Sequence, residues 1–227
     1  MATGLINPYT RHPVLIALTA ATIDELSNGR LILGLGAGVR PLIEQMGISF
    51  RKPLKAVEEA VEIIRLLLKD GFRGRRTTYR GEIFKINDVD FGACEYFTGF
   101  GRFKPIREQI PIYIGAISKR MIQLAGKIAD GVLLSLGSAP EYVKHFVIKN
   151  LKIGAEKAGR KVEDVDVATY ILCSVSKDKK EEHKEAKGFV TYALAYSSEE
   201  ILKVCGYDYE EIPVSYTHLT LPTTERV

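Results

Sequence analysis

The chain lacks tryptophan and contains only three cysteines and four histidines among its 227 residues. Cys94, Cys173 and Cys205 are odd in number, far apart, and without C-x-x-C spacing or a neighbouring histidine cluster. This pattern does not define a disulfide framework or a metal site. We therefore expect reduced, mostly packed thiols and no metal.

Long apolar runs are also absent. No stretch approaches the roughly 18 apolar residues that a membrane helix needs, and no charged and then apolar leader opens the chain. With 46% apolar and 26% charged residues, the composition is that of a globular protein large enough to bury a core. The cytoplasm is the default expected location.

Charge of one sign is not in large excess. The 32 Lys and Arg residues nearly balance the 28 Asp and Glu residues, and basic residues are interleaved with acidic ones. This distribution does not indicate a nucleic-acid-binding protein, although it is compatible with an anionic cofactor.

What the sequence does contain is an alternation of strand-like and amphipathic helical segments. The apolar strand segments show no polar alternation, which is typical of a parallel sheet buried on both faces. The expected fold class is therefore α/β. We expect strands over 30–36, 111–116, 131–136 and 166–176, and helices over 13–27, 53–69, 119–129, 140–158 and 179–196.

Two segments interrupt the alternation. Residues 71–110 are rich in Gly, Arg and aromatic residues, which predicts an insertion with one short hairpin around residues 79–86. Residues 214–227, VSYTHLTLPTTERV, resemble a translated sequencing adapter. We interpret them as a non-native tail, with a genuine chain terminus as the alternative. The domain is therefore expected over residues 1–213.

A glycine-rich turn, GLGAG, follows the first expected strand. The dinucleotide fingerprint G-x-G-x-x-G must open directly into a helix, but Val39 and Pro41 occupy its third glycine position when counted from Gly34 and Gly36. A Rossmann site is therefore disfavoured. Close backbone packing at a strand end explains these glycines as well as a ligand does.

A second candidate site is the turn in PIYIGAISKR, residues 111–120. The strand ends in small residues, Ser118 can cap the next helix, and Lys119 and Arg120 follow in its first turn. These cations oppose the helix dipole but suit a bound phosphate, which the free N–H groups of a helix start would also favour. An ordinary cap with solvated cations is the alternative.

Three stretches resemble a known family when they are taken as a set. The chain is similar to the bacterial-luciferase-like superfamily of flavin- and deazaflavin-dependent oxidoreductases, and within it to the archaeal methylenetetrahydromethanopterin reductases. The similarity runs from about residue 3 to 175. It rests on GLINPYTRHPVLIALTAATIDELSNGRLILGLGAG, on KPLKAVEEAVEIIRLLLKDG with YRGEIFKI, and on PIYIGAISKRMIQLAGKIADGVLLS.

The resemblance implies a partial (β/α)8 TIM barrel of luciferase-like type, with the flavin-type ring at the carboxyl ends of its strands. A whole barrel takes about 250 residues or more. We therefore expect this chain to cover roughly the third strand to the seventh, without the first two strands and the last strand-helix unit.

The resemblance also implies the cofactor-binding residues. Relatives hold a strained cis peptide that maps onto Gly4–Leu5, and they place a small polar side chain at Asn7, for which a turn residue before Pro8 is the alternative. The other implied residues are Gly36, Ala37, Gly38, Gly115, Ala116, Ile117, Ser118, Arg120 and Met121.

The implied activity is hydride transfer from reduced coenzyme F-420 (also written F420), an 8-hydroxy-5-deazaflavin, to a one-carbon-carrying pterin such as methylenetetrahydromethanopterin. The alternatives are an FMN-dependent monooxygenase and an inactive truncated barrel. Relatives often hold an acid where this chain has Val39, which cannot move a proton, so the catalytic residue is unassigned. We expect a small-molecule substrate, a homo-oligomer, and neither a nucleic-acid nor a membrane partner.

Overall fold

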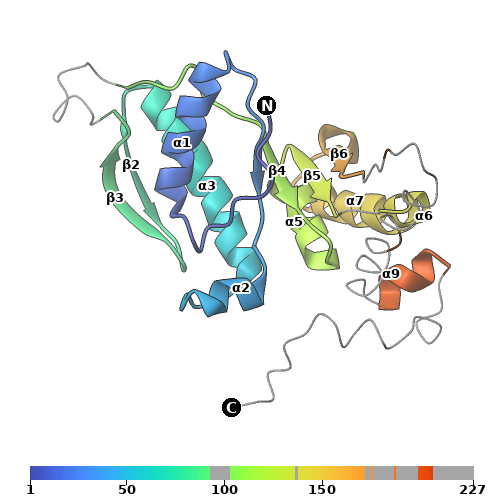
Figure 1. The fold of residues 1–227 in the computed structure, drawn as a ribbon. Helices are drawn as coiled ribbons and strands as arrows, with labels where there is room; N and C mark the ends of the chain where they lie inside the picture. Colours follow the sequence, from blue (N-terminus) through green and yellow to red (C-terminus); the bar gives the residue numbers. More distant parts are fainter. Residues whose placement is uncertain (93–102, 136–137, 172–174, 176–186, 188–198, 207–227) are drawn as a thin grey trace. The chain divides into compact units, whose positions relative to one another are not determined.

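The computed structural model describes residues 1–92, 103–135, 138–171, 175, 187 and 199–206. The chain divides into two compact units. The larger unit comprises Met1–Leu133 and Asn150–Ala168, and the smaller comprises Leu134–Lys149 and Thr169–Val227. The larger unit carries the helices and the sheet edge that form the candidate site (Figure 1).

A parallel sheet forms the centre of the fold. Its order is β1-β4-β5-β6, and both β1 with β4 and β4 with β5 pair in parallel. All three residues of β1 are buried, as expected for a strand covered on both faces. The predicted parallel α/β sheet is therefore confirmed. The strands are β1 (Leu33–Leu35), β4 (Ile112–Gly115), β5 (Gly131–Leu134) and β6 (Asp166–Thr169).

The first residues of the chain extend this sheet beside β1. Parallel bridges join Ala2 to Ile32 and Ile6 to Leu35, so the first segment advances four residues while its partner advances three. The extra residue makes a bulge between the two bridges. The bulge brings residues 3–5 close to the backbone of β1.

The helices begin where the sequence signals predict, whereas α3 continues three residues past its predicted end at residue 69. Proline occupies the first turn of both α1 (Pro13–Leu26) and α3 (Pro53–Phe72), where its missing N–H costs nothing. α1 ends before Asn28 and Gly29, both of which adopt positive φ. α1 packs against α3 in the larger unit (Figure 1). Their apolar faces supply much of the buried core.

The insertion contains the predicted hairpin, which is longer than the sequence indicated. Strands β2 (Arg76–Arg80) and β3 (Lys85–Asp90) pair in antiparallel register. A short helix, α2 (Arg40–Gln45), is not among the predicted elements; Pro41 lies in its first turn, where proline is tolerated. It follows β1 directly, at the carboxyl edge of the sheet.

The remaining helices match the predicted segments in part. The expected helix over 140–158 forms α6 (Pro140–Tyr142), a π-helical segment (Val143–Val147) and α7 (Ile148–Lys157). A 3-10 turn (Val162–Asp164) precedes β6, and the unpredicted α9 (Glu199–Val204) packs against α6 in the smaller unit. α5 (Lys119–Ile128) follows β4 as predicted.

Several predictions fall outside the described residues. These are most of the helix over 179–196, the end of the strand over 166–176, the tail over 214–227, and the environments of Cys94 and Cys173. Cys205 is a free thiol, and burial raises its pKa, with the charge of Glu141 acting in the same direction. Among the helices that are described, none is long and apolar enough to cross a membrane.

Candidate functional site

The candidate site is the carboxyl edge of the sheet in the larger unit. The loops that follow β1 and β4 start there, and the bulged first segment reaches the same edge. Parallel strands bring their carboxyl ends together, so segments far apart in sequence become neighbours. Three segments predicted separately from the sequence therefore meet in one place.

The side chain of Leu5 connects these segments. A Cβ added at Gly115 would lie 2.3 Å from Leu5 Cδ1, and a Cβ added at Gly36 would lie 3.2 Å from the same atom. Only bare backbone at the ends of β4 and β1 leaves room for this contact. Leu5 is nevertheless 50% exposed, so part of its surface is open to a ligand.

The predicted cis peptide between Gly4 and Leu5 is wrong. All peptide bonds of the described residues are trans. The close approach is instead made possible by a glycine on the neighbouring strand, because a Cβ at Gly34 would lie 2.1 Å from the Gly4 carbonyl oxygen. The bulge supplies the extra length, so a trans chain fits the site.

Asn7 lies beside the glycine-rich loop that follows β1. A Cβ at Gly38 would lie 3.2 Å from Asn7 Cβ. Its Oδ1 atom accepts hydrogen bonds from the backbone N–H groups of Tyr9 (3.1 Å) and Thr10 (2.9 Å) and from the Thr10 hydroxyl (3.1 Å). The turn interpretation of Asn7 is therefore confirmed for its oxygen. A contact between Asn7 and a cofactor stays a prediction.

The turn after β4 forms the predicted cap. Ser118 Oγ accepts a hydrogen bond from the Met121 N–H at 3.4 Å, and the Ala116 N–H donates to the Leu133 carbonyl at 3.1 Å. The N–H groups of Met121 and Ala116 therefore already donate to acceptors within the protein. The N–H groups of Lys119 and Arg120 belong to the first helical turn, which has no intrahelical acceptors, and they are the donors suited to an anion.

The site edge presents an apolar surface. Val39 is 58% exposed and Ile117 is 52% exposed, and both are close in sequence to the bare backbone of this edge. Such surfaces suit a flat ring better than a sugar or a metal ion. Glu44, the nearest acid in the sequence, forms an exposed ion pair with Arg40 at 3.4 Å.

Arg120 belongs to a second feature that the sequence did not reveal. It lines a groove bounded by α3, α5 and α7, and none of the groove residues belongs to the glycine-rich edge. Met121 is only 7% exposed and packs inward. The side chains of Arg120 and Met121 therefore lie in other surroundings than Leu5, while their backbone belongs to the first turn of α5.

His12 was not assigned a role from the sequence, and the structure gives it a local one. Its Nδ1 atom accepts a hydrogen bond from the Val14 N–H at 3.3 Å, which caps α1. Its ring meets Phe84 edge-on, with 5.5 Å between centroids. Burial lowers the pKa of His12, which favours the neutral form that can accept this bond.

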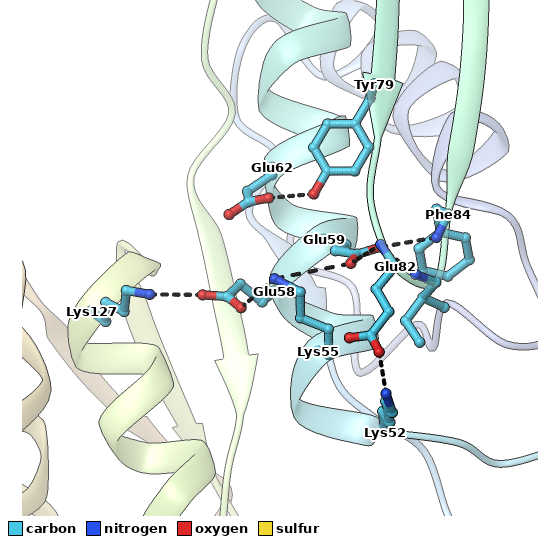
Figure 2. A network of polar contacts seen from close by, with 10 residues as sticks. Lys52, Lys55, Glu58, Glu59, Glu62, Tyr79, Glu82, Phe84 and Lys127 are labelled. Carbon is cyan, nitrogen blue, oxygen red and sulfur yellow. Dashed lines mark hydrogen bonds and ion pairs between the residues drawn. The ribbon is translucent and has the colours of Figure 1, made fainter.

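A buried carboxylate fixes the hairpin to α3, and sequence reasoning also missed it. Glu59 is fully buried and accepts hydrogen bonds from the backbone N–H groups of Glu82 (2.7 Å), Ile83 (2.9 Å) and Phe84 (2.9 Å) (Figure 2). A Cβ at Gly81 would lie 2.3 Å from Glu59 Oε2. The glycine in YRGEIF is the signal that could have revealed this contact.

Comparisons with known proteins support the geometry. Residues 1–214 match the profile of a family described as luciferase-like monooxygenase. A 5,10-methylenetetrahydromethanopterin reductase from Archaeoglobus fulgidus is 38% identical over 200 residues, covering 88% of this chain and 55% of the relative. An F420-dependent glucose-6-phosphate dehydrogenase from Nakamurella multipartita is 27% identical over 198 residues, covering 86% of this chain and 54% of the relative.

Solved structures agree with these matches. The coenzyme F420 dependent tetrahydromethanopterin reductase from Methanopyrus kandleri superposes with a TM-score of 0.75 at 30% identity, covering 92% of this chain and 60% of that chain. An F420-dependent secondary alcohol dehydrogenase, at 21% identity and a TM-score of 0.66, supports the fold alone. The chain spans 55% to 60% of the length of the two reductases. The expected α/β-barrel fold class is confirmed.

Proposed function

The chain belongs to the luciferase-like monooxygenase family, and we propose that it acts as an oxidoreductase. The proposed reaction is hydride transfer from reduced coenzyme F-420 to a one-carbon-carrying pterin such as methylenetetrahydromethanopterin. The similarity to reductases of that name, at 38% and 34% identity, supports the proposal. The observation that carries it is the contact of Leu5 with Gly36 and Gly115: the two glycines make room for this side chain, and its exposed half offers a ring-sized ligand an apolar wall.

The residues at this edge fit a deazaflavin ring. Leu5 fills the space that side chains at Gly36 and Gly115 would take, and the exposed parts of Leu5, Val39 and Ile117 offer apolar contact to a flat ligand. Ring binding at the carboxyl ends of the strands is also where this fold class places its chemistry. The ring would therefore lie along the edge, against Leu5.

The start of α5 fits the phosphate of the same cofactor. Ser118 shapes the turn, the first-turn N–H groups, including that of Arg120, and the positive end of the helix attract an anion, and the Lys119 side chain adds positive charge. The proposed cofactor-binding set is Gly4, Leu5, Asn7, Gly36, Ala37, Gly38, Gly115, Ala116, Ile117, Ser118, Arg120 and Met121.

When bound, the deazaflavin supplies the hydride chemistry. The residues of this chain would orient the ring and exclude water from its face, chiefly through Leu5 and Ile117. Val39 carries no proton, so no proton is taken up or released at that position. We leave the catalytic residue unassigned.

The second candidate is an FMN-dependent monooxygenase. The description of the matching family, luciferase-like monooxygenase, favours this alternative. The proposal further includes a homo-oligomer, a small-molecule substrate and a location in the cytoplasm. The proposal includes no nucleic-acid partner and no membrane partner.

Parallel absorbance titrations of the full chain with coenzyme F-420 and with FMN separate the two candidates. We expect saturable binding of F-420 and much weaker binding of FMN. Preferential binding of FMN would favour the monooxygenase, and binding of neither would contradict both. Turnover with methylenetetrahydromethanopterin and reduced F-420 then tests the substrate.

A further inference from the structure

The groove between α3, α5 and α7 has a distinct chemical character. Its volume is about 220 Å³, and Leu54 and Leu124 contribute apolar walls. Arg120, Lys127 and Lys157 bring three cations to it, whereas Glu58 brings one carboxylate. The lining therefore carries an excess of positive charge beside apolar surface.

Two glycines fix the shape of this groove. A Cβ at Gly154 would lie 1.9 Å from the Gln123 carbonyl oxygen, and a Cβ at Gly126 would lie 2.3 Å from the Leu151 carbonyl oxygen. α5 and α7 thus touch through their backbones. Because Gln123 and Gly154 both line the groove, main-chain packing fixes the junction of α5 and α7 at its base.

The carboxylate of Glu58 is already shared between two cations. Its oxygens lie 2.8 Å from Lys127 Nζ and 3.1 Å from Lys55 Nζ (Figure 2). Burial alone would raise the pKa of Glu58, but the hydrogen bonds from these lysines outweigh it, so the pKa is lowered. Glu58 is therefore ionised near neutral pH and is paired with Lys55 and Lys127, so its negative charge does not neutralise the other cations of the groove.

Arg120 and Lys157 form no ion pair within the described part of the chain. Cations that share a small, partly apolar groove repel one another, and an anion placed between them relieves that repulsion. Arg offers a planar fork that matches an oxyanion, and Lys adds a compact point charge. The two residue types together are suited to one acidic group.

We propose that this groove is a binding site for an oxyanion group, a carboxylate or a phosphate, held between Arg120 and Lys157. The group can come from a free small anion or from an acidic extension of a ligand bound at the sheet edge. The second source is geometrically open because Arg120 lies in the first turn of α5, two residues after Ser118. Only that second source rests on the proposed function.

Isothermal titration calorimetry with sodium malonate and sodium phosphate tests the free-anion source. The full chain, Lys157→Gln and the control Lys152→Gln are compared at low ionic strength, where exposed charges are least screened. Lys152 is on the same helix, α7, but does not line the groove and pairs with Glu156. We expect roughly tenfold weaker binding to Lys157→Gln, which corresponds to the loss of one charge-assisted contact, and no change in the control.

The second source is tested by titrating the same proteins with coenzyme F-420 and with its deazaflavin riboside, which lacks the phosphate and acidic side chain. Weaker binding of F-420 to Lys157→Gln, with unchanged riboside binding, assigns the groove to an extension of that ligand. Equal affinities of all three proteins for malonate, phosphate and F-420 would overturn the proposal. Matching thermal unfolding of the three proteins excludes misfolding as the cause of any difference.

Discussion

Leu5 and Gly115 are in contact across the carboxyl edge of the sheet, and a Cβ at residue 115 would come within 2.3 Å of Leu5 Cδ1. The contact joins the bulged first segment to the end of β4. It therefore explains why a glycine is required there and why the site depends on segments far apart in the sequence.

Gly115→Ala should destabilise the fold by about 1–3 kcal/mol, because the new methyl group must displace Leu5. Leu5→Ala in the same chain should recover much of that loss, since it removes the obstructing atoms. Urea unfolding of the two single variants and the double variant measures the coupling. Additive effects in this cycle would show that the Leu5–Gly115 contact does not constrain the edge.

Glu59→Gln should destabilise the protein by about 2–4 kcal/mol, because a buried carboxylate that accepts three N–H bonds is replaced by an amide that presents donors to some of them. Glu62→Gln is the matched control on the same helix. Glu62 accepts a hydrogen bond from Tyr79 at the surface, so its loss should cost about 1 kcal/mol or less. Hydrogen exchange at residues 82–84 should accelerate in Glu59→Gln alone, and similar exchange in both variants would contradict the assignment.

Asp24→Asn should cost about 3–5 kcal/mol, because it breaks a buried ion pair and leaves Arg107 without its partner. The Asp24 carboxylate accepts two hydrogen bonds from Arg107, at 2.7 and 2.8 Å, and one from the Leu31 N–H at 3.1 Å. Arg73→Gln breaks a more exposed pair with Glu108 and should change stability by about 1 kcal/mol or less. Equal losses in urea unfolding would be inconsistent with this difference in burial.

Protonation of His12 should weaken the start of α1. Because burial lowers its pKa below the ordinary value of 6.5, neutral His12 contributes stability that is fully present above that value. The contribution is lost as the pH falls through the lowered pKa, since a protonated Nδ1 cannot accept the Val14 N–H. His12→Asn keeps a capping oxygen and removes the titration. The unfolding midpoint should therefore fall less steeply between about pH 7 and about pH 5 in this variant than in the parent; parallel curves would refute the cap.

Local signals explain which parts of the fold could be predicted. Prolines at the helix starts and the positive-φ pair Asn28 and Gly29 act within a few residues, so the starts of α1 and α3 and the end of α1 followed from the sequence. For the glycines at residues 36 and 115, the sequence indicated only that they lie at the ends of strands. Their common partner, Leu5, depends on how three segments assemble.

Other features depend on tertiary contacts that leave little trace in the sequence. The trans Gly4–Leu5 peptide is accommodated by Gly34 on a neighbouring strand, so the cis isomer implied by the resemblance to relatives is wrong for this chain. Glu59 looks like an ordinary charged helix residue until the hairpin turn is placed against it. The oxyanion groove likewise arises only when three helices pack together.

The position of the cofactor is tested most directly by a pair of matched variants. Ile117→Glu places a negative charge on the exposed turn at the proposed ring and phosphate site, whereas Leu26→Glu makes the same type of change on an 80% exposed residue at the end of α1. Fluorescence titration with coenzyme F-420 should give at least tenfold weaker binding for Ile117→Glu, from the lost apolar contact and the repulsion of the phosphate. Leu26→Glu should bind like the parent protein. Equal affinities of the two variants would contradict the placement of the cofactor at this edge.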